Sequence, residues 1–264
     1  MLTDTEGKAM STTLFDLTGR RALVTGSSQG IGNSLAEGLA AAGAAVVLNG
    51  RDRTKVEDAA AALRSKGLAA DVAVFDVTDP DAVGEAVDAI EAGLGPIDIL
   101  VNNAGIQRRQ PLEDYPVETW REVMRTNVDS VFYVGQAVAR HMIGRKHGKI
   151  INICSLMSEA ARYSIAPYTT SKGAVKMLTK GMCTDWARHG IQVNGIGPGY
   201  FATPLNQALV DDPKFDSWLK ARTPAGRWGE TRELQGACIF LASAASDFVN
   251  GQVIYVDGGV LATI

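Results

Sequence analysis

The sequence of 264 residues predicts one doubly wound α/β domain, in which about seven parallel strands are flanked by helices. Two observations carry this prediction. Short apolar runs alternate with alanine-rich helical segments along nearly the whole chain. The short runs are also almost entirely apolar, without alternating polar residues, which is typical of parallel strands that are covered on both faces.

The expected elements follow one another without a linker or an internal repeat. Strands are expected at 21–25, 45–48, 72–75, 97–101, 149–153, 191–196 and 253–256, and helices at 31–42, 55–65, 81–92, 118–142 and 167–189. The segment 197–231 contains four prolines and a single short helical pattern, so we expect a lid or binding loop there. Residues 1–13 are polar and are expected to form a flexible leader before a domain at 14–264.

The composition excludes several classes of function. The net charge is −3 and the basic residues are scattered, which argues against nucleic acid or an anionic membrane as the main partner. No apolar run reaches transmembrane length. The cysteines are far apart, which favours a reducing cytoplasm, and the histidines lack metal-ligand spacing, so no metal is expected. These residues are Cys154, Cys183, Cys238, His141, His147 and His189.

A glycine-rich turn follows the first expected strand and opens the first helix. It reads T-G-S-S-Q-G-I-G from Thr25 to Gly32, and its glycines are Gly26, Gly30 and Gly32. Glycines let the backbone approach a ligand closely, and a helix N-terminus offers free N–H groups to a pyrophosphate. We therefore expect a dinucleotide cradle that also includes Ser28 and Ile31; the alternative is a tight turn without a ligand.

The end of the second expected strand bears on the choice of cofactor. An acidic side chain usually binds the ribose 2′-hydroxyl of NAD at this point, but here the strand ends in Asn49-Gly50-Arg51. A guanidinium suits a 2′-phosphate, so Arg51 favours NADP(H), with NAD(H) still possible because Asp52 follows directly. A solvated Arg–Asp turn is the alternative.

The third and fourth expected strands also end in polar or small residues. Asp76, followed by Val77, is placed to meet the adenine edge, or else to act as an acid in the first turn of the next helix. Asn103, Ala104 and Gly105 come after the fourth strand and either line a cofactor groove or form a plain turn.

Tyr168 and Lys172 belong to the run Y-T-T-S-K, and if helical they lie on one face because they are four residues apart. A phenol with its ordinary pKa of about 10 is a poor base, and a neighbouring ammonium lowers that pKa. Ser155 follows an apolar strand upstream and is suited to stabilise a developing alkoxide, or to cap the strand end. A serine hydrolase is excluded because Ser155 has no G-x-S-x-G elbow.

Together these motifs resemble the short-chain dehydrogenase/reductase family from Phe15 to the C-terminus. Besides the motifs above, the resemblance rests on Asn127, on Pro198-Gly199, and on V-D-G-G near the end of the chain. It implies a Rossmann fold, an NAD(P)-dependent oxidoreductase acting on CH–OH groups, and a homotetramer built through stretches such as 131–142 and 173–186.

The resemblance also implies roles for single residues. Tyr168 is the general acid/base, Lys172 holds the nicotinamide ribose and Asn127 holds a water that links Lys172 to solvent; an amide satisfying backbone is the alternative for Asn127. Pro198, Gly199, Phe201 and Thr203 match the stretch that meets the nicotinamide carboxamide, with a lid hinge as the alternative. NADP-preferring members often carry Arg where this chain has Gln29, so a 2′-phosphate would depend on Arg51.

Further stretches resemble the sugar-acid dehydrogenases of the family. They are Asn103-Ala104-Gly105-Ile106-Gln107, Gly197-Pro198-Gly199-Tyr200, Phe215-Asp216-Ser217-Trp218 and Thr223-Pro224-Ala225-Gly226-Arg227-Trp228-Gly229. A sugar acid needs a cation for its carboxylate, and Arg109 is the expected anchor, ahead of Arg108 and Gln107. The alternatives are a 3-oxoacyl-[acyl-carrier-protein] reductase, for which Arg108, Arg109 and Arg162 would form a basic docking patch, another sugar dehydrogenase of the family, or a non-catalytic NADP sensor.

Overall fold

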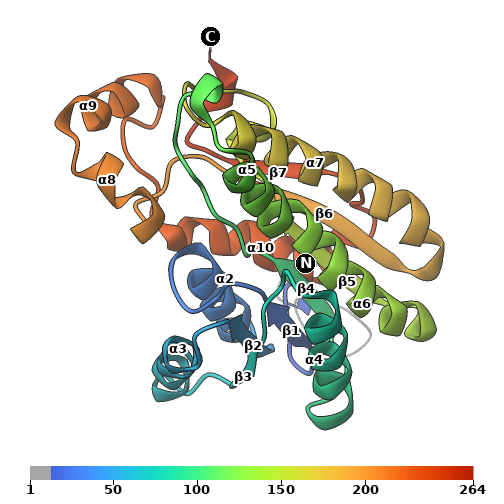
Figure 1. Cartoon of the computed structure of the whole chain (residues 1–264). Coiled ribbons are helices and arrows are strands. Elements are labelled where there is room, and N and C mark those ends of the chain that lie inside the picture. Colours follow the sequence, from blue (N-terminus) through green and yellow to red (C-terminus); the bar gives the residue numbers. More distant parts are fainter. Residues whose placement is uncertain (1–12, 264) are drawn as a thin grey trace.

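The computed structural model of the protein describes residues 13–263, and in them seven parallel strands form one sheet in the order β3-β2-β1-β4-β5-β6-β7 (Figure 1). The expected leader lies outside the described residues except for Thr13. The strands are β1 (Arg21–Val24), β2 (Ala45–Gly50), β3 (Ala70–Val74), β4 (Ile99–Asn102), β5 (Gly148–Ile153), β6 (Ile191–Pro198) and β7 (Val253–Val256). This sheet confirms the predicted fold class.

Helices cover both faces of the sheet. They are α2 (Gly30–Ala41), α3 (Arg53–Ser65), α4 (Pro80–Gly93), α5 (Val117–Met124), α6 (Ser130–Arg145), α7 (Ala166–Trp186), α8 (Gln207–Val210), α9 (Pro213–Arg222) and α10 (Gln235–Ala242). The short helices α8 and α9, orange in Figure 1, stand apart from those that flank the sheet. They belong to the segment that was expected to be a lid or binding loop.

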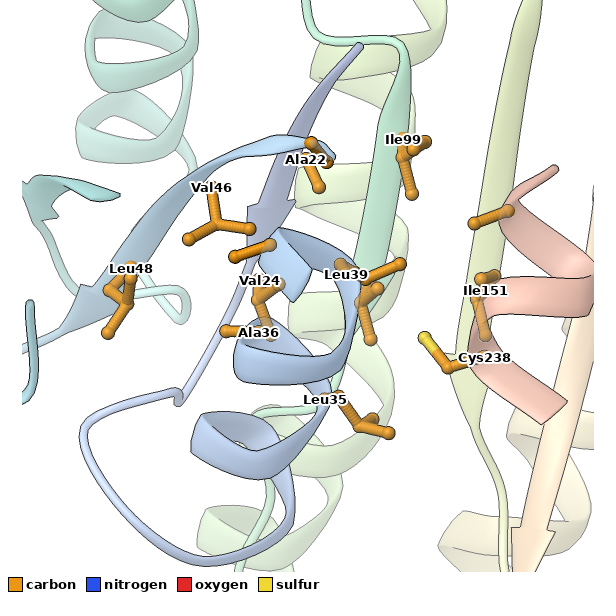
Figure 2. Packing of buried hydrophobic residues seen from close by; sticks show 14 of the residues in the cluster. Ala22, Val24, Leu35, Ala36, Leu39, Val46, Leu48, Ile99, Ile151 and Cys238 are labelled. Carbon is orange, nitrogen blue, oxygen red and sulfur yellow. The ribbon is translucent and has the colours of Figure 1, made fainter. Parts of the chain in front are cut away.

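The core consists of two apolar layers, one on each face of the sheet. In β1, Ala22 and Val24 pack in the layer beneath α2, α3 and α10, whereas Leu23 packs in the layer beneath α4, α6 and α7. Figure 2 shows Leu35 and Leu39 of α2 against the strands of the first layer. Since side chains alternate between the faces and both faces are covered by helices, the consecutive residues Ala22, Leu23 and Val24 are all apolar.

The order of the strands creates a crevice at one edge of the sheet. From β1 the chain proceeds to β2 and β3 on one side, and from β4 to β7 on the other. The loops that follow β1 and β4 therefore diverge, and ligands in such sheets bind at this point.

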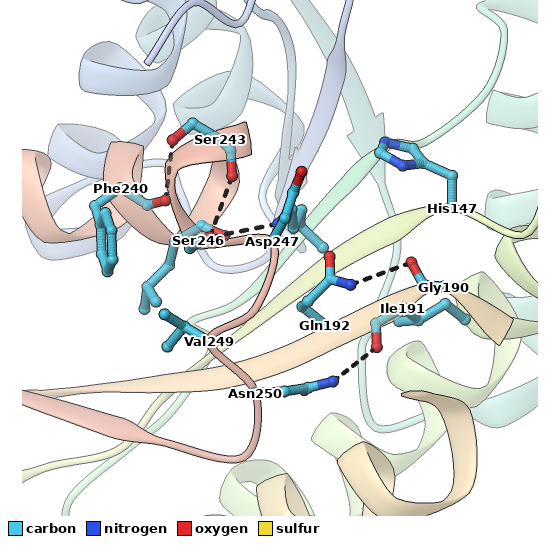
Figure 3. A network of polar contacts seen from close by, with 12 residues as sticks. His147, Gly190, Ile191, Gln192, Phe240, Ser243, Ser246, Asp247, Val249 and Asn250 are labelled. Atoms are coloured by element: carbon cyan, nitrogen blue, oxygen red, sulfur yellow. Dashed lines mark hydrogen bonds and ion pairs between the residues drawn. The ribbon is translucent and has the colours of Figure 1, made fainter. Parts of the chain in front are cut away.

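Polar side chains hold β7 beside β6. Ser246 Oγ donates to the carbonyl of Ser243 at 3.2 Å, and Asn250 Nδ2 donates to that of Ile191 at 3.2 Å (Figure 3). Nearby, buried Lys149 pairs with Asp247 at 2.7 Å. These bonds fix the connection between α10 and the last strand.

Two helical regions differ from the sequence-based expectation. The helix expected at 118–142 is interrupted by a π-helical turn at Arg125–Asp129, which separates α5 from α6. Continuous apolar periodicity across the turn conceals the interruption. Helix α10 was not predicted, because its eight residues QGACIFLA are almost uniformly apolar and show no helical period.

Candidate active site

One cavity of about 660 Å³ follows the carboxyl ends of the first six strands. All the residues expected to bind the cofactor or the substrate line it: Gly26, Ser28, Gly30, Ile31, Gly32, Arg51, Asp76, Val77, Asn103, Ala104, Gly105, Arg109, Ser155, Tyr168, Lys172, Pro198, Gly199, Phe201 and Thr203. Asn127 is the one expected catalytic residue that does not line it. The fold therefore gathers motifs that are up to 177 residues apart in the chain (Gly26 to Thr203) into a single site.

The glycine-rich turn has backbone conformations and contacts that exclude side chains. Gly26 and Gly30 have φ values of +60° and +63°, in the left-handed region that favours glycine. A Cβ on Gly32 would lie 2.4 Å from Asn103 Nδ2 and 2.5 Å from the Gly26 carbonyl oxygen. Within the described chain, no side chain caps the first turn of α2, and that turn contains no acid. The turn is therefore suited to the close approach of an anion.

The residues after β4 hold this turn in place. Asn103 Nδ2 donates to the carbonyls of Thr25 and Gly26, both at 2.9 Å. In return, Thr25 Oγ1 accepts from the amides of Asn103 at 3.0 Å and Ala104 at 3.1 Å. Asn103 lines the cavity, as expected, and its side-chain amide also stabilises the conformation of the glycine-rich turn.

Arg51 and Asp52 have different surroundings. The Asp52 carboxylate caps α3, where it accepts from the amide of Lys55 at 3.2 Å. Arg51 is largely exposed and lies 3.7 Å from Asp76. The Asp52 carboxylate therefore binds the N-terminus of α3, and the guanidinium of Arg51 provides a positive charge at the end of β2.

Asp76 is both an ion-pair partner and a turn acid. Its Oδ1 accepts from the amide of Thr78 at 2.9 Å and from the Thr78 hydroxyl at 2.8 Å. Burial raises the pKa of Asp76, but these hydrogen bonds and the charges of Arg51 and Arg125 outweigh burial and lower it. Asp76 is consequently ionised at neutral pH and keeps the end of β3 ordered.

Tyr168, in the first turn of α7, is partly buried in the cavity wall. Burial raises its pKa, while a hydrogen bond with Ser155 and the charge of Arg109 oppose the rise. The net direction is upward, so the phenol is protonated at neutral pH. The expected lowering of the Tyr168 pKa by Lys172 is not seen, because burial is the largest effect and the opposing groups are Ser155 and Arg109.

Ser155 has two functions in the structure. Its hydroxyl accepts from the amide of Met157 at 3.1 Å and so caps the short 3₁₀ turn Leu156–Ser158. The same hydroxyl lines the cavity together with Tyr168 and opposes the rise in the pKa of the phenol. Ser155 can therefore cap the turn and still donate its hydroxyl proton into the cavity, because the capping bond uses the oxygen only as an acceptor.

Lys172 is almost fully buried, one turn after Tyr168 on α7. Its Nζ donates to the carbonyl of Ile153 at 2.6 Å and lies 5.8 Å from the centroid of the Tyr168 ring. Burial lowers the pKa of Lys172 to about 8. The ammonium is thus aimed at the same end of β5 that carries Ser155.

Asn127 lies in the π-helical turn and is fully buried. Its Oδ1 accepts from the amide of Ile106 at 2.8 Å, and its Nδ2 donates to the Ile106 carbonyl at 2.9 Å and to Ser171 Oγ at 3.0 Å. The side chain therefore binds the loop after β4 to α7, which is the alternative that the sequence left open. The expected water link to Lys172 stays a prediction.

The three arginines near the cavity are not equivalent. Arg108 pairs with Glu122 at 2.8 Å and does not line the cavity. Arg109 and Arg162 both line it, together with Tyr200. From the sequence, Arg162 was expected only in a possible docking patch, and Tyr200 was given no role. Both residues could have been recognised as site candidates because they lie in the segments that follow strands β5 and β6.

The segment after β6 closes one side of the cavity. Phe201 and Thr203 are buried, and Phe201 forms an isolated parallel bridge with Gly229. Beyond them, α8 and α9 extend away from the sheet (Figure 1). The expected lid segment is thus anchored at Phe201 and carries two short helices.

Comparisons with known proteins agree with this geometry. A family model described as enoyl-(acyl carrier protein) reductase matches residues 26–261. Gluconate 5-dehydrogenase of Gluconobacter oxydans (strain 621H) is 61% identical over 95% of this chain and 98% of the relative. The chain belongs to the short-chain dehydrogenase/reductase family. This confirms the resemblance seen in the sequence.

Two further relatives of this short-chain dehydrogenase/reductase are informative. The 5-keto-D-gluconate 5-reductase of Escherichia coli (strain K12) is 53% identical over 95% of this chain and 99% of the relative. A crystal structure of a gluconate 5-dehydrogenase from Burkholderia cenocepacia J2315, in complex with NADP and tartrate, is 62% identical, with a TM-score of 0.94 over 96% of this chain and 100% of that one.

Gly32→Ala should damage the glycine-rich turn specifically. The new methyl must displace Asn103 or the Gly26 carbonyl, so we expect the KM for the nicotinamide cofactor to rise on the order of 10-fold or more. Gly84→Ala in α4 is the matched control, because a Cβ there meets nothing within 4 Å. The control should keep its KM and gain up to about 1 kcal/mol of stability. Equal KM values in the two variants would contradict the cradle.

Proposed function

We propose that the protein is an NAD(P)-dependent dehydrogenase that interconverts a secondary alcohol and a ketone of a sugar acid, with gluconate and 5-ketogluconate as the substrate pair. One observation carries the proposal: Tyr168, Ser155 and Lys172 meet at the end of β5 in the cavity that also contains the glycine-rich turn and Arg109. The names of the relatives support the substrate.

The cavity fits a dinucleotide, and NADP(H) is favoured over NAD(H). The glycine-rich turn would hold the pyrophosphate, and Arg51 with Ser28 would hold the 2′-phosphate. Lys55 also lines the cavity, and its ammonium pairs with Asp52 at 3.8 Å. The related crystal structure with NADP supports this preference. A bound nicotinamide accepts or supplies the hydride.

Tyr168 is proposed to move the proton of the substrate hydroxyl. In oxidation the phenolate oxygen takes that proton, and in reduction the phenol returns it to the carbonyl oxygen. Ser155 donates a hydrogen bond to the same substrate oxygen, where negative charge develops. Because burial disfavours the phenolate, a positive charge close to Tyr168 is needed for it to act as a base near neutral pH.

Lys172 and Asn127 support this proton transfer in the proposal. Lys172 brings positive charge beside the phenol and would hold the nicotinamide ribose. Asn127 fixes Ile106 and Ser171, and through them the position of α7, whose first turn carries Tyr168. Its link to Lys172 through water is part of the proposal.

Arg109 is proposed to bind the substrate carboxylate. Its guanidinium lines the cavity close enough to Tyr168 to influence the pKa of the phenol. A guanidinium can bind a carboxylate through two hydrogen bonds and so orient the sugar chain. The acyl-carrier alternative is less well supported, because Arg108 is neutralised by Glu122 and the expected basic patch is broken.

The proposal includes a homotetramer in the cytoplasm. Phe132 on α6 and Met177 on α7 are 44% and 60% exposed, which suits burial between subunits. The three cysteines are free thiols, as a reducing compartment favours. Light scattering should give a mass near four chains of 28.0 kDa, and a monomer would contradict the assembly.

A substrate panel tests the function most directly. The purified protein should oxidise gluconate with NADP faster than with NAD, because Arg51 suits the 2′-phosphate. It should reduce 5-ketogluconate with NADPH and leave an acetoacetyl thioester nearly untouched. Turnover of the thioester with none of the sugar acid would replace this function with the acyl-carrier alternative.

Tyr168→Phe removes the proton-transferring oxygen and little else. Turnover should fall by at least ~100-fold, while the cofactor still binds because the glycine-rich turn is intact. Cofactor affinity is measured by the quenching of tryptophan fluorescence, and turnover by absorbance of the reduced nicotinamide. Near-normal turnover in this variant would rule out Tyr168 as the acid/base.

A further inference from the structure

Two guanidinium groups with like charge share the substrate end of the cavity. Arg109 comes from the loop after β4, and Arg162 comes from the loop between β5 and α7. Both line the cavity together with Tyr168. Burial is the larger of two effects that lower the pKa of Arg109, and the positive charge of Arg162 is the second, which indicates that the two guanidinium groups are close. Two cations side by side repel each other, so an anion between them is favoured.

No acidic side chain in the described part of the chain neutralises this pair. Among residues 13–263, neither Arg109 nor Arg162 forms an ion pair, whereas the neighbouring Arg108 pairs with Glu122 at 2.8 Å. Arg125 does not line the cavity, and its guanidinium donates to the carbonyl of Thr78. Arg51 and Lys55, which also line the cavity, pair with Asp76 at 3.7 Å and Asp52 at 3.8 Å, so the unpaired charges lie in the part of the site that contains Tyr168.

Arg162 is held by aromatic residues of the lid segment. Its guanidinium carbon lies 4.7 Å from the centroid of the Phe215 ring on α9. Tyr200 is its second neighbour: burial raises the pKa of the Tyr200 phenol, while the charge of Arg162 and a hydrogen bond with it lower that pKa. The cation–π contact with Phe215 holds the guanidinium at the cavity wall without neutralising it.

Those two aromatic residues belong to a larger cluster. Tyr200 and Phe215 contact each other at 5.6 Å between ring centroids, and both contact Trp218 and Trp228. Trp228 Nε1 in turn donates to Asp216 at 2.9 Å. A cluster of four aromatic rings is rigid and apolar, so it positions Arg162 relative to α9.

We propose that Arg162 is a specificity-determining residue that binds the substrate carboxylate jointly with Arg109, and that Phe215 and Tyr200 position it. This inference rests on the proposed sugar-acid function and deepens it. A carboxylate has two oxygens, each able to accept from one guanidinium, and it relieves the repulsion between the two cations. The site therefore selects sugar acids over the matching neutral sugars and alditols, and the same contact joins α9 to the bound anion.

Arg162→Gln tests the proposal, with Arg108→Gln as the matched control. Both variants remove one positive charge near the cavity, but only Arg162 lines it. We expect the KM for gluconate to rise about 10-fold to 100-fold in Arg162→Gln, the range for a charge-assisted hydrogen bond. The inhibition constant of the matching alditol should change less than about 3-fold. Arg108→Gln should leave both constants as they are.

Two milder variants separate charge from position. Arg162→Lys keeps the charge but loses the planar, stacked guanidinium, so the gluconate KM should rise by less than in Arg162→Gln. Phe215→Leu keeps an apolar contact but removes the ring, and a rise of about 2-fold to 5-fold is expected. Tm values within about 4 °C of the wild type show that each variant is folded.

Three outcomes would overturn the inference. The first is an unchanged gluconate KM in Arg162→Gln, and the second is an equal loss for gluconate and the alditol, which would show that Arg162 only shapes the lid. The third comes from the intrinsic tryptophan fluorescence, to which Trp218 and Trp228 contribute and which is used to follow gluconate binding without turnover. If gluconate changes the fluorescence equally in the wild type and in Arg162→Gln, or in neither, the inference is overturned. If gluconate binding depends on Arg162 but no oxidation occurs, the inference is supported and only the proposed reaction is contradicted.

Discussion

A buried hydrogen bond ties the chemistry to the sheet. Lys172 Nζ donates to the carbonyl of Ile153 at 2.6 Å, and this fixes one face of α7 against the end of β5. Tyr168 lies one turn earlier on the same face, and Ser155 follows Ile153 by two residues. The three groups are therefore placed by a strand end and a helix, which hold side chains more precisely than loops do.

Burial sets the electrostatics of the site. It raises the pKa of Tyr168 and lowers that of Lys172 to about 8, so both groups resist their charged forms. Positive charge from Arg109 works against the first effect. A phenol close to cations loses its proton more readily when a further positive charge is placed beside it. In our proposal the guanidinium of Arg162 adds positive charge where the substrate carboxylate binds.

Much of this could be predicted from the sequence, since the strands are continuous apolar runs and the site motifs stand at their ends. Gly26 to Gly32, Ser155 and Y-T-T-S-K were located because each has its own spacing. Helix α10 was missed because it is apolar on all sides. The π-helical turn was missed because the apolar period runs through it, and with it the clamp from Asn127 to Ile106. The pairing of Arg109 with Arg162 depends on two distant loops, so no local pattern could show it.

The pH dependence of the forward and reverse reactions is the most direct test of a buried phenol as the proton carrier. Oxidation requires the phenolate, so its kcat should rise as the pH increases through the pKa of Tyr168. Reduction requires the phenol, so its kcat should fall over the same interval. Profiles that mirror each other in this way are predicted by the account. Profiles that rise together or fall together would contradict it, because one group cannot then serve as base in one direction and acid in the other.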